Sequence, residues 1–360
     1  MTNTTISTIQ FELPSQLACP LPTEERGVTR DQIRLLVTSN NGDDVQHSHF
    51  SHLGDFLQAG DLLVVNTSAT LPAAIPLDLP NGKQGVLHLS NKLPNGRWLV
   101  EIRAIENNKT RRWKAGEKGM YFQLPHGGHL KLIKRFYNQD HLLDLWEIEL
   151  STPDNIEAYL MKSGQAIKYN HVQKNYPLDY YQTCFSSTPG SAEMPSAARG
   201  FTPELVSKLL KKGVDFAPIL LHTGVSSLEI DEKPYPEYME VSELSARKIR
   251  LAKTLGHRIV AVGTTAVRAV ESSVDERGVI QAFKGHTSLF IHQDDSMKVV
   301  DALLTGFHEP MASHLHILQA LVSDEHLEKA YTEAIDAGYF WHEFGDLHLL
   351  INGYSRTISS

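Results

Sequence analysis

One segment combines residue types that could bind an anionic group. Residues 258–268 read Arg-Ile-Val-Ala-Val-Gly-Thr-Thr-Ala-Val-Arg, an apolar run that stops at Gly263 and resumes behind Thr264 and Thr265. This pattern predicts a strand followed by a helix, whose first turn carries unpaired N–H groups and the positive end of the helix dipole. Arg268, about one turn further on, adds a planar guanidinium suited to a carboxylate or phosphate. The segment is a candidate anion site, although Gly-Thr-Thr also serves as plain strand-to-helix punctuation.

Three further side chains are candidates for proton transfer. His222, at a predicted strand end, and His308 carry imidazoles, which titrate near neutral pH. Asp301 is flanked by apolar residues and would be costly to bury without a partner, which indicates a hydrogen-bonded or functional carboxylate. A histidine at a strand end is also often a hydrogen-bonded structural residue, so both interpretations of the two imidazoles stay open.

A cationic substrate could be recognised around Glu237. Its carboxylate could balance a positive charge or act as a base, and the rings of Tyr235 and Tyr238 could face the same cation. A solvated turn is the alternative interpretation. No metal is predicted, because the nearby histidines at 308, 314 and 316 lack the ligand spacing of a metal site. The two cysteines also lack the spacing of metal ligands and are expected to stay reduced thiols.

The rest of the sequence predicts the scaffold that positions these side chains, an α/β fold with an inserted β unit. Residues 1–72 and 155–360 are predicted to form a discontinuous α/β body, and residues 73–154 a small β-barrel insert. Strands are expected within the insert at 85–89, 97–104, 119–124, 128–136 and 142–150, with turn signals at Asn81-Gly82 and Asn95-Gly96.

The body should alternate strands and helices after residue 200. Thr202 and Ser242 are expected to cap two helices, the second with an apolar stripe of Leu244, Ile249, Ala252 and Leu255. Further helices are expected at 264–273, 311–322 and 324–337, and strands at 216–222 and before Gly263.

Composition narrows the class of protein. The 360 residues, 41% hydrophobic and 21% charged, suit an ordinary globular protein of about two domains. No run of ~18 apolar residues predicts a membrane span, and the polar start lacks a signal-peptide pattern, so no membrane partner and a cytoplasmic location are expected. The sequence leaves the oligomeric state open.

The net charge of −8 bears on nucleic-acid binding, because a protein that binds an RNA backbone gains affinity from Lys and Arg contacts to phosphate. A negative total does not favour such binding, but two local basic clusters could still contact phosphate: residues 109–118, which carry five basic side chains, and Lys208, Lys211 and Lys212. A solvated surface is the alternative for each. Trp113 in the first cluster could stack on a base or pack within a strand.

The chain resembles the S-adenosylmethionine:tRNA ribosyltransferase-isomerase family. The similarity is carried in order by blocks at 30–37, 60–66, 181–183, 189–191, 201–204, 221–224, 258–268, 299–308 and 345–351. The resemblance implies an α/β domain with a β-barrel insert. It also implies transfer and isomerisation of the ribosyl part of S-adenosylmethionine onto a 7-deazaguanine base of tRNA, which forms epoxyqueuosine in queuosine biosynthesis. S-adenosylmethionine would be a co-substrate, bound with help from Tyr181 and Gln182 in a matched block.

Several blocks depart from the family's pattern. Gly200 stands where the family has a histidine, and residues 66–69 read Asn-Thr-Ser-Ala in place of Asn-Asp-Thr-Arg. Residues 233–238 keep Glu237 but lack two histidines, and residues 226–228 and 308–313 are also altered. These changes are typical of a divergent paralogue. They leave two alternatives to the family activity: a paralogous S-adenosylmethionine-using enzyme with a small-molecule acceptor, or a non-catalytic ligand- or RNA-binding module.

Overall fold

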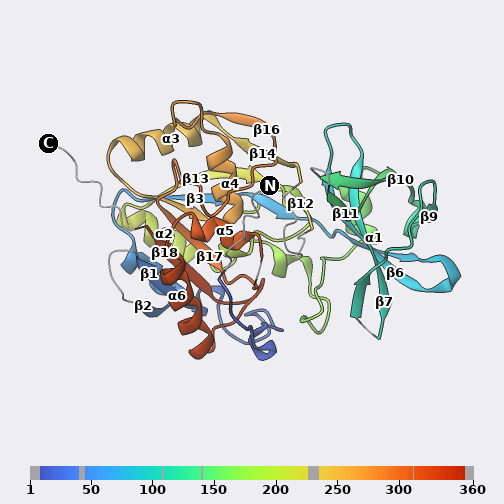
Figure 1. Cartoon of the computed structure of the whole chain (residues 1–360), viewed down its shortest axis with the longest axis horizontal. Helices are drawn as coiled ribbons and strands as arrows, with labels where there is room; N and C mark the ends of the chain where they lie inside the picture. The colour runs from blue at the N-terminus through green and yellow to red at the C-terminus, as the bar shows by residue number, and fades with distance from the viewer. Residues whose placement is uncertain are drawn as a thin grey trace, which may run out of the picture.

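The computed structural model describes residues 9–39, 45–107, 109–138, 141–225, 235–310 and 312–352. A mixed nine-stranded sheet with its helices forms the larger part, and a seven-stranded antiparallel sheet lies beside it (Figure 1). The predicted α/β class is confirmed. In the described residues, no helix is long and apolar enough to span a bilayer.

The nine-stranded sheet has the order β16-β14-β13-β3-β15-β17-β18-β1-β2. Its four central strands β13, β3, β15 and β17 run parallel, so their carboxyl ends meet at one edge. In sheet order, the strands are β16 (Phe283–Thr287), β14 (Glu237–Val241), β13 (Asp215–Leu221), β3 (Leu62–Asn66), β15 (Ile259–Val262), β17 (Ala302–Gly306), β18 (Leu347–Ile351), β1 (Arg34–Ser39) and β2 (Val45–His49).

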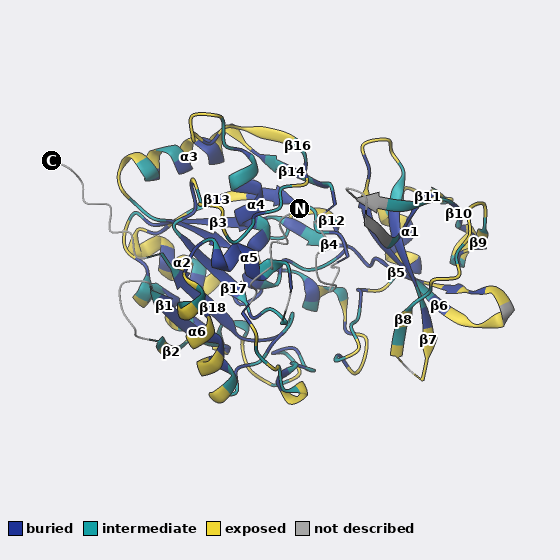
Figure 2. Cartoon of the chain, in the orientation of Figure 1, coloured by how far each residue is buried: buried dark blue, intermediate teal, exposed yellow. Residues whose placement is uncertain are grey.

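Helices cover both faces of this sheet because successive buried side chains of its strands point to opposite sides. Leu62 and Val64 of β3 pack with the helices of one face, and Leu63 and Val65 pack with those of the other. Figure 2 shows the buried strands between the helices. The first face carries α3 (Glu243–Thr254), α4 (Thr264–Ser272), α5 (His314–Gln319) and α6 (Asp324–Asp336), and the second carries α2 (Pro203–Lys212).

The helix boundaries follow local signals. The Thr202 hydroxyl accepts from the Leu205 N–H at the start of α2, and Ser242 does the same for Ser245 at the start of α3. The predicted apolar stripe of α3 was wrong at Leu244, which is 61% exposed, and at Leu255, because α3 turns Ser245 and Ala246 to the core instead. The helix expected at 311–322 is shorter in the structure.

The second sheet has the order β5-β6-β7-β11-β10-β9, with β8 paired to β7. It curls into a half-barrel whose end strands β5 and β9 contact each other, and α1 (Ile156–Ser163) packs against it. The five expected strands are confirmed, whereas β5 and β8 were not predicted. The strands are β5 (Ala74–Asp78), β6 (Gln84–Lys92), β7 (Trp98–Glu106), β8 (Lys109–Arg112), β9 (Tyr121–Gln123), β10 (His129–Asn138) and β11 (His141–Ser151).

A short parallel pair joins the two sheets. β4 (Ser68–Thr70) follows β3 directly and pairs with β12 (Thr188–Ser191). Because β4 leads from the end of β3 into the half-barrel, the second sheet begins near the carboxyl edge of the first. This connection places residues of both sheets around one cavity.

Candidate functional site

A cavity of about 1440 Å³ lies at the carboxyl edge of the parallel strands. In open α/β sheets, ligands bind at this edge. The body contributes Gly263–Thr265 and Thr305–His308, and the half-barrel contributes Glu101, Arg103 and Thr110–Arg112. The cavity is therefore shared between the two sheets.

The predicted anion-binding turn faces this cavity. Gly263 ends β15 with φ +89° and ψ 154°, a conformation that side chains disfavour, and α4 starts at Thr264. Gly263, Thr264 and Thr265 all line the cavity. The amide of Asn66, at the end of β3, donates to the Thr265 hydroxyl at 3.3 Å and so fixes the turn against the neighbouring strand.

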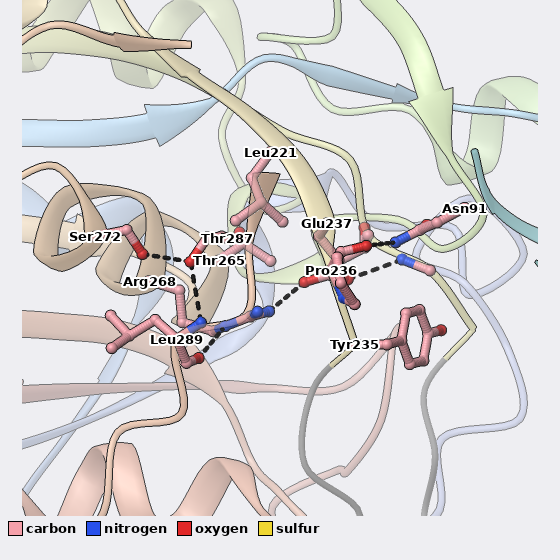
Figure 3. A network of polar contacts seen from close by, with 12 residues as sticks. Asn91, Leu221, Tyr235, Pro236, Glu237, Thr265, Arg268, Ser272, Thr287 and Leu289 are labelled. Carbon is pink, nitrogen blue, oxygen red and sulfur yellow. Dashed lines mark hydrogen bonds and ion pairs between the residues drawn. The ribbon is translucent and has the colours of Figure 1, made fainter. Parts of the chain in front are cut away.

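Arg268 lies one turn behind and does not line the cavity. It is buried on α4 and forms an ion pair with Glu237, while its Nε donates to the Leu289 carbonyl at 3.1 Å. Figure 3 shows the guanidinium between these two partners. Its Nη2 has no hydrogen-bond partner among the described residues. Arg268 thus ties α4 to β14 and the 289 segment.

Glu237 is also engaged within the protein. One carboxylate oxygen accepts from the Gly224 N–H at 2.9 Å and the other from Arg268. Tyr235 is buried, with its hydroxyl on Ser90 and the Val225 carbonyl, and burial raises its pKa well above the usual value. These contacts hold the start of β14 against the half-barrel.

His222 follows β13 but does not belong to the cavity lining. Its Nδ1 lies 2.7 Å from the Ser68 hydroxyl, and its ring stacks on Tyr238 at 5.8 Å. Burial lowers the pKa of His222 to about 4, although Glu240 acts in the opposite direction. The imidazole is therefore neutral at neutral pH. Gly190 lies against the ring, where any side chain would collide with it.

His308 lies in the cavity wall, at the end of the segment that follows β17. Its Nε2 is 2.9 Å from the Thr305 hydroxyl, and its ring stacks on His314 at 4.9 Å. Burial lowers the pKa of His308 well below its usual value, and the neighbouring His314 lowers it further. Burial also lowers the pKa of His314 to about 4. The cavity thus contains two imidazoles that are uncharged at neutral pH and are weaker bases than exposed histidines.

The remaining predicted residues divide between the cavity and the scaffold. Tyr181 lines the cavity, and burial raises the pKa of its phenol. Gln182 instead exchanges hydrogen bonds with both backbone groups of Thr70, another lining residue, at 2.9 and 2.8 Å. Asp301 lies at the opposite edge of the sheet, where its carboxylate accepts from the Ile259 N–H at 2.9 Å.

The cavity also contains a stack of aromatic rings that was not predicted from the sequence. The rings of Tyr169, His171 and His342 are stacked, with centroids 6.2 and 4.2 Å apart. The Glu343 carboxylate accepts from His171 at 2.9 Å, and Glu309 lies 3.5 Å from His342. The one sequence signal near His342 and Glu343 is the block at 345–351, which carries part of the family resemblance.

One of the altered positions, Gly200, has a local explanation. A side chain there would meet the Phe50 ring at 2.8 Å, so the packing leaves no room for a larger residue. Arg199 beside it is buried and pairs with Glu24. Residues 226–228, 233, 234 and 311 lie outside the described residues. The described part of the chain holds no group of three or more His, Cys, Asp or Glu side chains that could bind a metal ion.

Comparisons with known proteins agree with this architecture. A family model described as queuosine biosynthesis protein matches residues 6–350. The S-adenosylmethionine:tRNA ribosyltransferase-isomerase of Thermotoga petrophila is 31% identical over 354 residues, which cover 96% of this chain and 99% of that protein. The enzyme of the same name from Magnetococcus marinus is 32% identical, over 96% of this chain and 94% of its own.

A solved structure covers the same length. The crystal structure of S-adenosylmethionine tRNA ribosyltransferase from Thermotoga maritima is 27% identical in sequence and has a TM-score of 0.52, over 95% of this chain and 99% of that one. On the family model and these nearly full-length relatives, the chain belongs to the queuosine biosynthesis protein family of S-adenosylmethionine:tRNA ribosyltransferase-isomerases.

Proposed function

We propose that this protein transfers and isomerises the ribosyl moiety of S-adenosylmethionine onto the 7-deazaguanine base of a tRNA, forming epoxyqueuosine. The relatives are named for this S-adenosylmethionine:tRNA activity. The observation that carries the proposal is the shared cavity, in which the first turn of α4 and the His308–His314 pair lie opposite cationic residues of the half-barrel. We also propose that the protein acts in the cytoplasm, where it meets its tRNA.

The first turn of α4 would bind the carboxylate of the methionine portion. Its helix N-terminus favours a negative group, and Gly263 lets the backbone approach without a side chain in the way. Arg268 supports this turn from behind through Glu237. In this assignment Arg268 positions the turn rather than contacting the carboxylate.

His308 would accept the proton beside the sulfonium. Burial keeps the imidazole uncharged at neutral pH, so the ring has a free lone pair for this proton, while the lowered pKa makes it a weaker base than an exposed histidine. The Thr305 hydroxyl, 2.9 Å from Nε2, orients the ring. The bond between the ribose and adenine then breaks, its electron pair leaves with adenine, and His308 returns the proton it accepted to the leaving adenine.

We further propose that residues 73–154 form a domain of their own, inserted into a body built from residues 1–72 and 155–360. Its support is the separate apolar core of the half-barrel, which includes Leu87, Leu99 and Ile148. The insert would then bring the cationic wall to the cavity.

Adenine release from S-adenosylmethionine tests the activity. The purified protein is incubated with tRNA carrying the 7-deazaguanine precursor, with the free base, and without an acceptor. Release that depends on the tRNA is the expected result. Release with the free base alone would point to a small-molecule acceptor, and binding of S-adenosylmethionine without release in any tube would show a non-catalytic module.

A further inference from the structure

We infer that β8 and residues 169–171 form one RNA-binding face, which contacts phosphates through Arg111 and its neighbours and stacks an unpaired base on Tyr169. This inference rests on the proposed function for the identity of its RNA. It assigns binding to cavity-lining residues of two segments: Arg111 on β8 of the half-barrel, and Tyr169 to His171 in the segment that follows α1.

The cationic part of the face begins with two arginines directly opposite each other. Arg103 of β7 pairs with Arg112 of β8 in the antiparallel ladder, an arrangement that like charges normally disfavour. The buried Glu101 carboxylate lies between them, 2.8 Å from Arg103 Nη1 and 3.0 Å from Arg112 Nε. Hydrogen bonds and charges from His88 and Arg103 outweigh burial and lower the pKa of Glu101 to about 2, so it stays ionised.

Further cations surround this pair. Asp144 is shared by Arg112, Lys114 and Arg135 at 3.7, 3.4 and 3.3 Å. Among the residues that the structure describes, Glu101 and Asp144 thus contact four cationic side chains. Arg111 adds a fifth, because it is exposed and makes no hydrogen bond or ion pair with any residue that the structure describes. An exposed arginine at the cavity, beside this cluster of cations, suits a polyanion even on a chain of net charge −8.

A clamp connects this strand to the aromatic stack. The Asn170 side chain accepts from the Thr110 N–H at 3.0 Å and donates to the Thr110 carbonyl at 3.2 Å. Asn170 therefore pairs with the edge of β8 as another strand would. Its neighbours Tyr169 and His171 are consequently held beside Arg111, although about 60 residues separate them in the sequence.

The stack itself offers a flat surface at the cavity. Tyr169 and His171 are nearly parallel, with 7° between their planes, and His342 continues the stack at 18°. All three line the cavity. Proteins recognise single-stranded RNA loops by combining contacts to phosphate with stacking of splayed bases on aromatic rings. The two parts of this face supply both kinds of contact.

The test compares four forms of the full-length protein: the wild type, Arg111→Glu, Tyr169→Ala and Arg277→Glu. Arg277 is exposed in the turn after α4 and outside the cavity lining, and its replacement changes the net charge by the same amount as Arg111→Glu. The Kd for tRNA carrying the 7-deazaguanine precursor is measured across a salt series, and the Kd for S-adenosylmethionine is measured without RNA. Thermal unfolding confirms that each variant is folded.

Arg111→Glu is expected to weaken tRNA binding at low salt and to reduce the slope of log K against log salt by about 1. Tyr169→Ala is expected to weaken it about 5- to 100-fold with an unchanged slope. Arg277→Glu should bind tRNA as the wild type does, and all S-adenosylmethionine affinities should stay at the wild-type level.

The inference is overturned if the wild type does not bind the tRNA, or if the Arg111 and Tyr169 variants bind it as Arg277→Glu does. The assignment of base stacking to Tyr169 also fails if Tyr169→Ala weakens S-adenosylmethionine binding as much as tRNA binding. The proposed function fails separately: Arg111-dependent tRNA binding without adenine release would leave the RNA-binding face in place and exclude the reaction.

Discussion

Arg268 on α4 forms a buried ion pair with Glu237, the first residue of β14. The pair joins the helix that starts at the cavity to a strand that begins beside the half-barrel, since Tyr235 just before it bonds to Ser90 of β6. The position of the α4 turn therefore depends on a contact 31 residues away in sequence.

Arg268→Met is expected to destabilise the protein by about 3–5 kcal/mol, because it leaves the Glu237 carboxylate buried without its cation. The double variant Arg268→Met/Glu237→Gln should recover part of this loss. Urea unfolding measures both. Arg250→Met is the control, because the side chains of its pair with Glu243 are 29% and 63% exposed, against 10% and 9% in the Arg268 pair, and such a pair should contribute no more than about 1 kcal/mol. Equal losses for Arg268→Met and Arg250→Met would contradict the prediction.

Gly263→Ala is expected to cost about 1–3 kcal/mol and to weaken S-adenosylmethionine binding. The φ of +89° with ψ 154° is a region that only glycine adopts readily, so alanine must shift the first turn of α4. Gly338→Ala provides a comparison, since it also has positive φ but nothing within 4 Å of the new methyl group. Ligand titration should show a loss of affinity for Gly263→Ala only; wild-type affinity in that variant would remove the turn from the site.

His308→Gln is expected to lower kcat for adenine release by about 10²–10⁴-fold while KM for S-adenosylmethionine changes little. The reason is that the neutral imidazole is the proton acceptor in the proposed reaction, whereas glutamine keeps a polar contact to Thr305. Steady-state kinetics separates the two constants. His52→Gln, at an exposed position, should behave as the wild type. A purely structural role for His308 would instead show as lost stability with kcat retained per folded molecule.

His348 predicts a pH dependence of stability. Burial lowers its pKa from the usual 6.5 to about 3, and nearby His326 adds to the effect. The unfolded chain therefore binds more protons than the folded one between these values. Stability should be complete above about pH 6.5 and should fall as the pH drops toward 3, by up to about 1.4 kcal/mol per pH unit for this residue.

His348→Gln should make that dependence shallower. The ring is fully buried, bonds through Nε2 to the Thr38 hydroxyl at 2.8 Å and stacks on Phe307. Urea unfolding from pH 7 to 4 gives the slope for the variant and the wild type. The variant should also be less stable at pH 7, because the stacked ring is lost. Parallel slopes would show that His348 is not a source of the pH dependence.

The sequence by itself determined the local elements. Gly263 between an apolar run and two threonines predicts the β15–α4 junction, and Thr202 and Ser242 predict two helix starts, because turns and caps depend on a few adjacent residues. The order of matched blocks also indicated the family. The exposed leucines of α3 show the limit of this approach, since several apolar positions were available and packing selected which of them face the core.

Only the tertiary structure decided which side chains meet. The sheet order brings β13, β3, β15 and β17 to one edge, so Thr265 and His308 share a cavity, while Asp301 lies at the other edge of the sheet. The partner of Arg268 and the Asn170 clamp on β8 also follow from strand pairing. Such contacts join residues far apart in the chain, and the periodicity of a short segment carries no information about which distant strand will lie beside it.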